Sequence, residues 1–183
     1  MRVQTTPNLQ HNVPLSFKQM PMEHNDKQVE QALDEALGKA KYYVDAEGKK
    51  EGERYFWFPN EGDSMTDNTH RSIPAGSLVL GRLLPVNSVR DIPLHRPIVV
   101  IINDNGRQYC LLKSVCRIAT DDAPDANTGS EEFCLRSYNP SPRCDDFWLP
   151  FFCVKFVFVI ERVKRPDGSE FVPKEEEVVR KRQ

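Results

Sequence analysis

The chain lacks long apolar runs, and its N-terminus does not show the basic and then apolar stretch of a secretory signal. The longest apolar stretch, Phe147 to Ile160, is interrupted by Pro150 and Lys155 and is too short to span a membrane. A chain without either feature is expected to stay away from membranes. The predicted location is therefore cytoplasmic, with no membrane partner.

The chain also lacks the paired spacing of metal ligands. It has five cysteines and no C-x-x-C pair, which argues against both a zinc site and a disulfide framework. The four histidines are scattered without ligand spacing: His11, His24, His70 and His95. We expect reduced and mostly packed cysteines, no metal site and no cofactor.

A strongly basic field is absent as well, because the formal net charge is -2. Nor does the sequence contain an evident helix-turn-helix, so DNA binding is not supported. The 183 residues, 39% of them hydrophobic, provide enough material for a core. This length predicts one principal domain with a small additional part.

The small part is predicted to be an N-terminal arm over residues 1–51. Its first 25 residues hold three prolines and few consecutive apolar positions, which is typical of an extended or disordered segment. A helix is then predicted, because apolar residues recur at helical spacing at Val29, Ala32, Leu33, Ala36, Leu37 and Ala40. Residues 45–53 are charged, contain two glycines and are typical of a linker.

From Tyr55 onward the pattern changes to short β-strands separated by turns. Strands are predicted at Arg54–Pro59, Ser77–Leu83, Pro97–Asn103, Arg107–Ile118, Phe133–Ser137 and Phe151–Arg162. Asp104-Asn105-Gly106 predicts a hairpin turn, and residues 119–130 a polar loop. The fold class is therefore mainly β, with a β domain over residues 52–165 and a charged C-terminal tail over 166–183.

Chemistry is indicated by Gly62-Asp63-Ser64-Met65, a tight loop shortly before a strand, and by Lys113 on a later strand. A serine hydroxyl is a weak nucleophile unless a base takes its proton, and a desolvated lysine can be that base. Ser64 and Lys113 are the candidate catalytic residues. Gly62, Asp63 and Met65 are expected to shape the loop, whose backbone N–H groups would bind the oxyanion.

Each of these residues has a more common role. Most Gly-Asp-Ser triplets are turns, and lysine on an edge strand usually protects against aggregation. The apolar neighbours of Lys113 favour an inward-pointing side chain, whose pKa burial would lower. Ser137 and Asn139 are expected only to form a turn.

Three motifs in this order resemble the S24 peptidases, the self-cleaving LexA, UmuD and phage-repressor proteins. They are Gly62 to Leu80, Leu111-Leu112-Lys113, and Ser137-Tyr138-Asn139-Pro140. The resemblance covers about residues 55–163. It implies a LexA/signal-peptidase-like β domain, a Ser64–Lys113 dyad for cleavage of the protein itself or of a partner, and a role in SOS or prophage transcriptional regulation. It also implies a homodimer, with RecA–single-stranded-DNA filaments as co-protease.

The chain departs from the family pattern at the cleavage site, because no Ala-Gly or Cys-Gly dipeptide precedes Ser64. The nearest substitutes are Leu37-Gly38 and Glu47-Gly48. An alternative function is therefore a non-catalytic S24-like module that serves dimerisation or partner binding.

Overall fold

A computed structural model describes residues 26–37, 42–45, 52–120 and 131–174. Its elements, in chain order, are α1 (Asp26–Leu37), β1 (Tyr43–Asp45), β2 (Tyr55–Pro59), β3 (Leu78–Leu84), η1 (Val89–Asp91), β4 (Pro97–Asp104), β5 (Arg107–Ala119), β6 (Glu132–Arg136), η2 (Pro142–Cys144), β7 (Phe147–Pro150), η3 (Phe151–Cys153), β8 (Val154–Lys164) and β9 (Glu170–Phe171). The protein is mainly β, as the sequence predicts.

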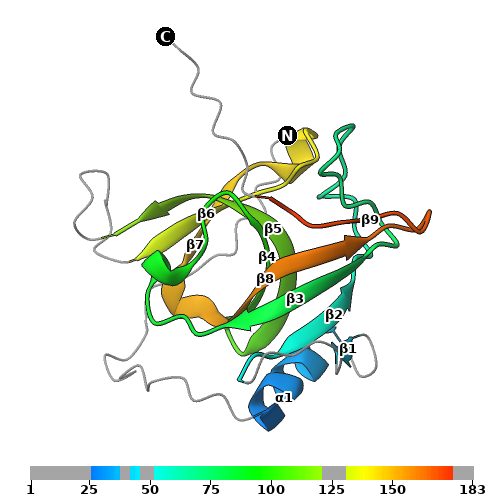
Figure 1. Cartoon of the computed structure of the whole chain (residues 1–183). Helices are drawn as coiled ribbons and strands as arrows, with labels where there is room; N and C mark the ends of the chain where they lie inside the picture. The colour runs from blue at the N-terminus through cyan, green and yellow to red at the C-terminus, as the bar shows by residue number, and fades with distance from the viewer. Residues whose placement is uncertain (1–25, 38–41, 46–51, 121–130, 175–183) are drawn as a thin grey trace.

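All of the described strands belong to one antiparallel sheet, whose order is β1-β2-β3-β8-β4-β5-β6-β7, with β9 added beside β8. Figure 1 shows that this sheet curls round on itself, with α1 lying across one side of it. The central strand β4 is buried over its first six residues, which explains its uninterrupted apolar sequence. The β4–β5 hairpin closes through Asn105 and Gly106, both with positive φ, as an Asn-Gly turn requires.

Two clusters of buried side chains form the core. The first lies under α1 and contains the aromatic side chains Phe56, Phe58 and Phe158. The second contains the side chains of η1 and η3 together with those of β6 and β7. Strand β5 contributes to both clusters as well, with Leu112 packed against the first and Leu111 against the second.

The predicted helix is confirmed over Asp26–Leu37, where Val29 and Leu33 are fully buried. Ala40 of the predicted stripe lies outside the described residues, as do the proline-bearing arm, most of the polar loop 119–130 and residues 175–183 of the tail. Of the helices in the described ranges, none combines the length and the apolar character needed to cross a membrane.

The strand prediction missed two short strands and placed the start of the last long strand too early. Two strands were not predicted from the sequence: Tyr43–Asp45 and Phe147–Pro150. Both are short, and they are stabilised by pairing at the two ends of the sheet. The last long strand begins at Val154 rather than Phe151, since Phe151–Cys153 form a 3-10 turn. The sheet also continues beyond residue 165 through β9.

Candidate active site

The Ser64 loop connects β2 to β3, and the buried Asn60 anchors its base. The Asn60 side-chain amide donates to the carbonyls of Gly62 at 3.1 Å, Ile73 at 2.9 Å and Pro74 at 3.2 Å. The two sides of the loop are also joined by backbone hydrogen bonds, in which Asn60 N donates to Ser77 O and Gly76 N donates to Asn60 O. One side chain therefore holds the outgoing and returning parts of the loop together.

A second asparagine, from the segment after β6, fixes the tip of the loop. Asn139 N donates to Ser64 O at 3.0 Å, and Asn139 Nδ2 donates to Asp63 O at 3.2 Å. With these carbonyls tied back, the N–H groups of Ser64 and Met65 have no acceptor among the described residues. These two N–H groups are the backbone donors nearest to the Ser64 side chain, and the expectation that they bind an oxyanion stays a prediction.

Met65, Gly62 and Asp63 differ in their exposure. The Met65 side chain is fully buried in the first core cluster, and its carbonyl accepts from Ile73 N at 2.8 Å. Gly62 and Asp63 are exposed beside the serine. The loop is thus held from below by Met65 and leaves Ser64 at the surface.

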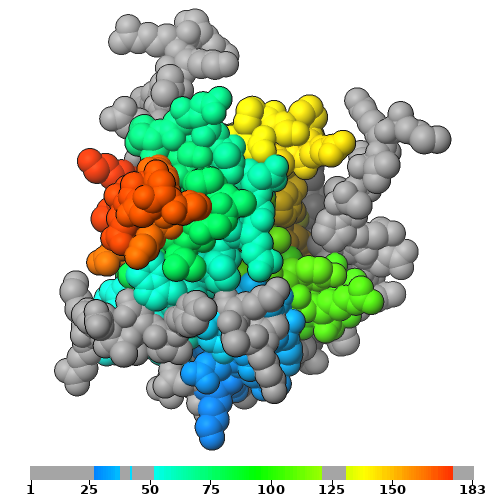
Figure 2. Space-filling model, turned by 90° about the vertical axis from the view of Figure 1, so that its right-hand side faces the viewer, coloured from blue at the N-terminus to red at the C-terminus, as the bar shows by residue number. Residues whose placement is uncertain are grey.

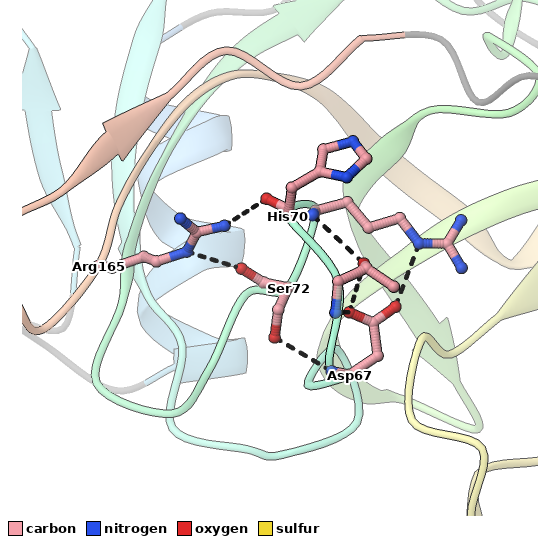
Figure 3. Close-up of polar contacts among 6 residues, drawn as sticks. Asp67, His70, Ser72 and Arg165 are labelled. Atoms are coloured by element: carbon pink, nitrogen blue, oxygen red, sulfur yellow. Dashed lines mark hydrogen bonds and ion pairs between the residues drawn. The ribbon is translucent and has the colours of Figure 1, made fainter.

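The excursion after Met65 is stabilised by its own polar network, drawn in Figure 3. The Asp67 carboxylate accepts from the Thr69 hydroxyl at 2.6 Å and pairs with Arg71 at 3.2 Å, while Asp67 N donates to Ser72 Oγ at 3.0 Å. Burial alone would raise the pKa of Asp67, but the hydrogen bonds from Thr69 and Arg71 outweigh it and lower the pKa.

Arg165, which follows β8, clamps this excursion to the sheet. Its guanidinium donates to Ser72 O at 3.0 Å and to His70 O, as Figure 3 shows. The same group lies 4.3 Å from the centre of the Phe171 ring. The end of the β domain thus supports the loop that carries Ser64.

Lys113 lies on β5, and its side chain turns into the protein. Its ammonium donates to Ser137 Oγ at 2.9 Å. Burial lowers the pKa of Lys113, while the nearby Cys144 and Asp63 oppose that shift in part. This is the direction that the sequence predicts for a general base, because a neutral amine must be populated near neutral pH.

Ser64 and Lys113 line the same cleft, which has a volume of about 310 Å³. Its other walls come from the last turn of α1, from residues 58–62 and from strands β3 to β5; they are Ala36, Leu37, Phe58, Pro59, Asn60, Glu61, Gly62, Val79, Val99, Cys110, Leu111 and Leu112. Figure 2 shows this side of the molecule, where the segment after β2, the segment after β6 and the β4–β5 hairpin meet above α1. In the form described, the lysine bonds Ser137 and not Ser64.

Ser137 and Asn139 have larger roles than the turn the sequence predicts for them. Ser137 is buried and is the partner of Lys113, and Asn139 reaches across to the Ser64 loop. Asn139 keeps a local role too, since its Oδ1 accepts from Ser141 N at 2.9 Å. The Ser137-Tyr138-Asn139-Pro140 motif marks this segment in the sequence, but neither long-range contact can be inferred from it, because both depend on β5, β6 and the Ser64 loop meeting in space.

A group of possible metal ligands lies elsewhere on β5 and β6. Cys116, Cys134 and Asp146 bring their ligand atoms within 4.8 Å of one another. The Asp146 carboxylate is already held on both oxygens by Arg136, at 3.1 and 2.7 Å. Burial, followed by the neighbouring Cys116, raises the pKa of Cys134 to about 12, so this thiol stays protonated at neutral pH. The positive charge of Arg136 opposes a cation at this place.

Comparison of the chain with protein-family models, with curated proteins and with solved structures finds no match.

Proposed function

We propose that the protein is a serine endopeptidase in which Ser64 is the nucleophile and Lys113 the general base. The observation that carries the proposal is the half-buried Lys113, with its pKa lowered by burial, in one cleft with Ser64. A structural lysine gains nothing from such burial, because an ammonium out of water is costly. Perturbed titration inside a cleft is characteristic of functional sites.

In the proposed reaction, neutral Lys113 takes the Ser64 proton as Ser64 Oγ attacks the peptide carbonyl carbon. The tetrahedral oxyanion accepts hydrogen bonds from the N–H groups of Ser64 and Met65. Lys113 then passes its proton to the leaving amine, and an acyl-enzyme remains on Ser64. Water, deprotonated by Lys113, hydrolyses that ester and restores the serine.

Ser137 positions the base in this scheme. A neutral amine has one lone pair and can still donate to Ser137 Oγ. With one N–H directed to Ser137, the lone pair is restricted to the remaining directions, which include the opening of the cleft where Ser64 lies. Removing a rotation of the base in this way contributes to catalysis by orientation.

The substrate we propose is the protein's own N-terminal arm or a partner protein, and the setting is SOS or prophage-type regulation by a homodimer. These parts of the proposal rest on the S24 resemblance of the motifs around Ser64, Lys113 and Asn139. The alternative, a non-catalytic module for dimerisation or partner binding, is favoured by the missing cleavage dipeptide.

The test is incubation of the pure full-length protein between neutral and alkaline pH, with fragments measured by mass spectrometry. We expect the fragment yield to climb as pH rises through the lowered pKa of Lys113 and then to level off. Ser64→Ala and Lys113→Arg should both abolish cleavage, because guanidinium stays protonated at any workable pH. Lys155→Arg, at an exposed position of β8, is the matched control and should cleave normally.

Fragments that form equally fast from the Ser64→Ala protein would come from a contaminating protease and would refute the proposal. A wild-type protein that stays intact at every pH, and that also leaves added casein uncut, would favour the non-catalytic alternative.

A further inference from the structure

The last turn of α1 forms part of the wall of the cleft that holds the dyad. Ala36 and Leu37 line this cleft together with Ser64 and Lys113. Both side chains also pack against the first core cluster, in which Val29 and Leu33 of the same helix are fully buried. The helix therefore reaches the site through its apolar face.

The strand edge beside this cleft has backbone groups left over. β4 pairs with all of Arg107–Ser114, but β6 pairs with β5 only from Ser114 onward. Across the cleft, β1 pairs with β2 only as far as Trp57. Among the described strands, nothing pairs with the outer edges of residues 107–113 or 58–59. Such edges accept an extended peptide as an added strand.

The end of α1 covers the apolar side of this cleft, but a helix cannot use the strand edges, because its own backbone groups bond within the helix. α1 is also a weakly built helix. It has 12 residues, a length that is marginal alone in water, and no basic residue in its last turn. The Tyr42 hydroxyl also holds the helix, since it donates to Asp34 Oδ1 at 3.1 Å and to Glu30 O at 3.3 Å.

We propose that α1 is an internal occupant of the substrate cleft, and that an extended peptide with apolar side chains takes its place. The inference rests on the proposed function for its catalytic consequence, but the occupation itself can be measured without catalysis. The helix blocks the apolar subsites with Ala36 and Leu37, and a peptide strand would offer the same apolar contacts plus the backbone hydrogen bonds. The dyad then acts only when α1 has left.

Cys110 reports the state of the cleft directly. Cys110 is half-buried, lines the cleft together with Ala36 and Leu37 of α1, and has its pKa raised to about 12 by burial. Departure of α1 would expose the thiol and remove the cause of that shift, so both effects speed its alkylation. Cys153 lies in the second core cluster, away from α1, and reports global unfolding in the same molecule.

The experiment is pulsed alkylation of the full-length protein with iodoacetamide, followed by peptide mapping. Leu33→Asp places a charge in the buried face of α1 and should speed alkylation of Cys110 by about tenfold or more. The free energy that corresponds to a tenfold change is smaller than the free-energy cost of losing a buried leucine side chain. Alkylation of Cys153 should stay unchanged. Gln28→Asp introduces the same residue at an exposed position of α1 and should leave Cys110 protected.

If Leu33→Asp exposes Cys153 as well, the same alkylation measurement is made on Leu37→Asp. This substitution should disturb the core less, because Leu37 is only half-buried. Cys110 that stays protected in both variants would overturn the inference. Ser64-dependent cleavage of added casein should rise in Leu37→Asp in step with Cys110 alkylation. Equal cleavage by wild type and Leu37→Asp would overturn the inference and leave the proposed function intact. Faster alkylation of Cys110 without any Ser64-dependent cleavage would refute the proposed function, while the inference that α1 occupies the cleft would stand.

Discussion

Gly81 lies where β3 crosses the aromatic part of the first core cluster, and its replacement by alanine tests the packing behind the cleft. A Cβ added to Gly81 would lie 2.8 Å from Phe158 Cβ and 3.0 Å from Phe58 Cε2. These two rings pack edge to face, with centroids 4.9 Å apart. Since the Phe158 Cβ is fixed by its own strand, the new methyl group can be accommodated only by moving a strand.

The cost follows from these distances. Adding a methyl group to a filled core typically destabilises a protein by about 1–3 kcal/mol. Alanine would otherwise gain up to about 1 kcal/mol over glycine in a strand, because the unfolded chain loses freedom. The net expectation is a loss of about 1–2 kcal/mol, and each kcal/mol lowers the melting temperature of a protein this size by about 2–4 °C. Displacement of Phe58 would also reshape the cleft, which Phe58 lines.

The assay is thermal and urea unfolding of Gly81→Ala beside Gly62→Ala. A Cβ on Gly62 meets nothing within 4 Å, so this control should be as stable as the wild type or slightly more stable. If Gly81→Ala proves as stable as the control, the close approach of β3 to the two phenylalanines is not rigid. The account of the core behind the cleft would then be wrong.

Three further predictions concern the site. Lys113→Met should stabilise the protein at neutral pH. Because the pKa of Lys113 is lowered in the folded state, the unfolded chain binds this proton more tightly than the folded one. The wild type therefore gains stability as pH rises from the lowered pKa to the usual value, and the advantage of the variant disappears. Urea unfolding at neutral and alkaline pH that shows the same stability difference between the variant and the wild type at both would contradict this expectation. Ser137→Ala should slow self-cleavage about tenfold, and should move the pH–rate midpoint to lower pH because the ammonium loses its acceptor. An unchanged midpoint would remove Ser137 from contact with the base. Asn60→Asp replaces a donor to three carbonyls by a carboxylate and should cost about 1–3 kcal/mol in thermal unfolding, whereas no loss would show that the loop holds itself without Asn60.

Most of the secondary-structure elements could be predicted from the sequence because their causes are local. The α1 stripe follows from helical spacing, and the β4–β5 hairpin follows from an apolar run, an Asn-Gly turn and a second β-rich run. The serine loop and the lysine strand were recognised from a few neighbouring residues each. Local preference was insufficient for β1 and β7, which are short strands stabilised by their partners.

The tertiary structure alone decided which groups surround the two candidate residues. The sequence by itself placed Ser64 in a tight loop and Lys113 on an apolar strand. It did not show that Ser137 binds the lysine, that Asn139 ties the serine loop, or that α1 ends at the cleft. These contacts join residues from 24 to 76 positions apart. They exist because antiparallel pairing brings β5 beside β6 and because the buried face of α1 must cover a core that the strands create. A local sequence pattern does not predict these long-range contacts, since each segment satisfies its own local structural preferences equally well without the other segment.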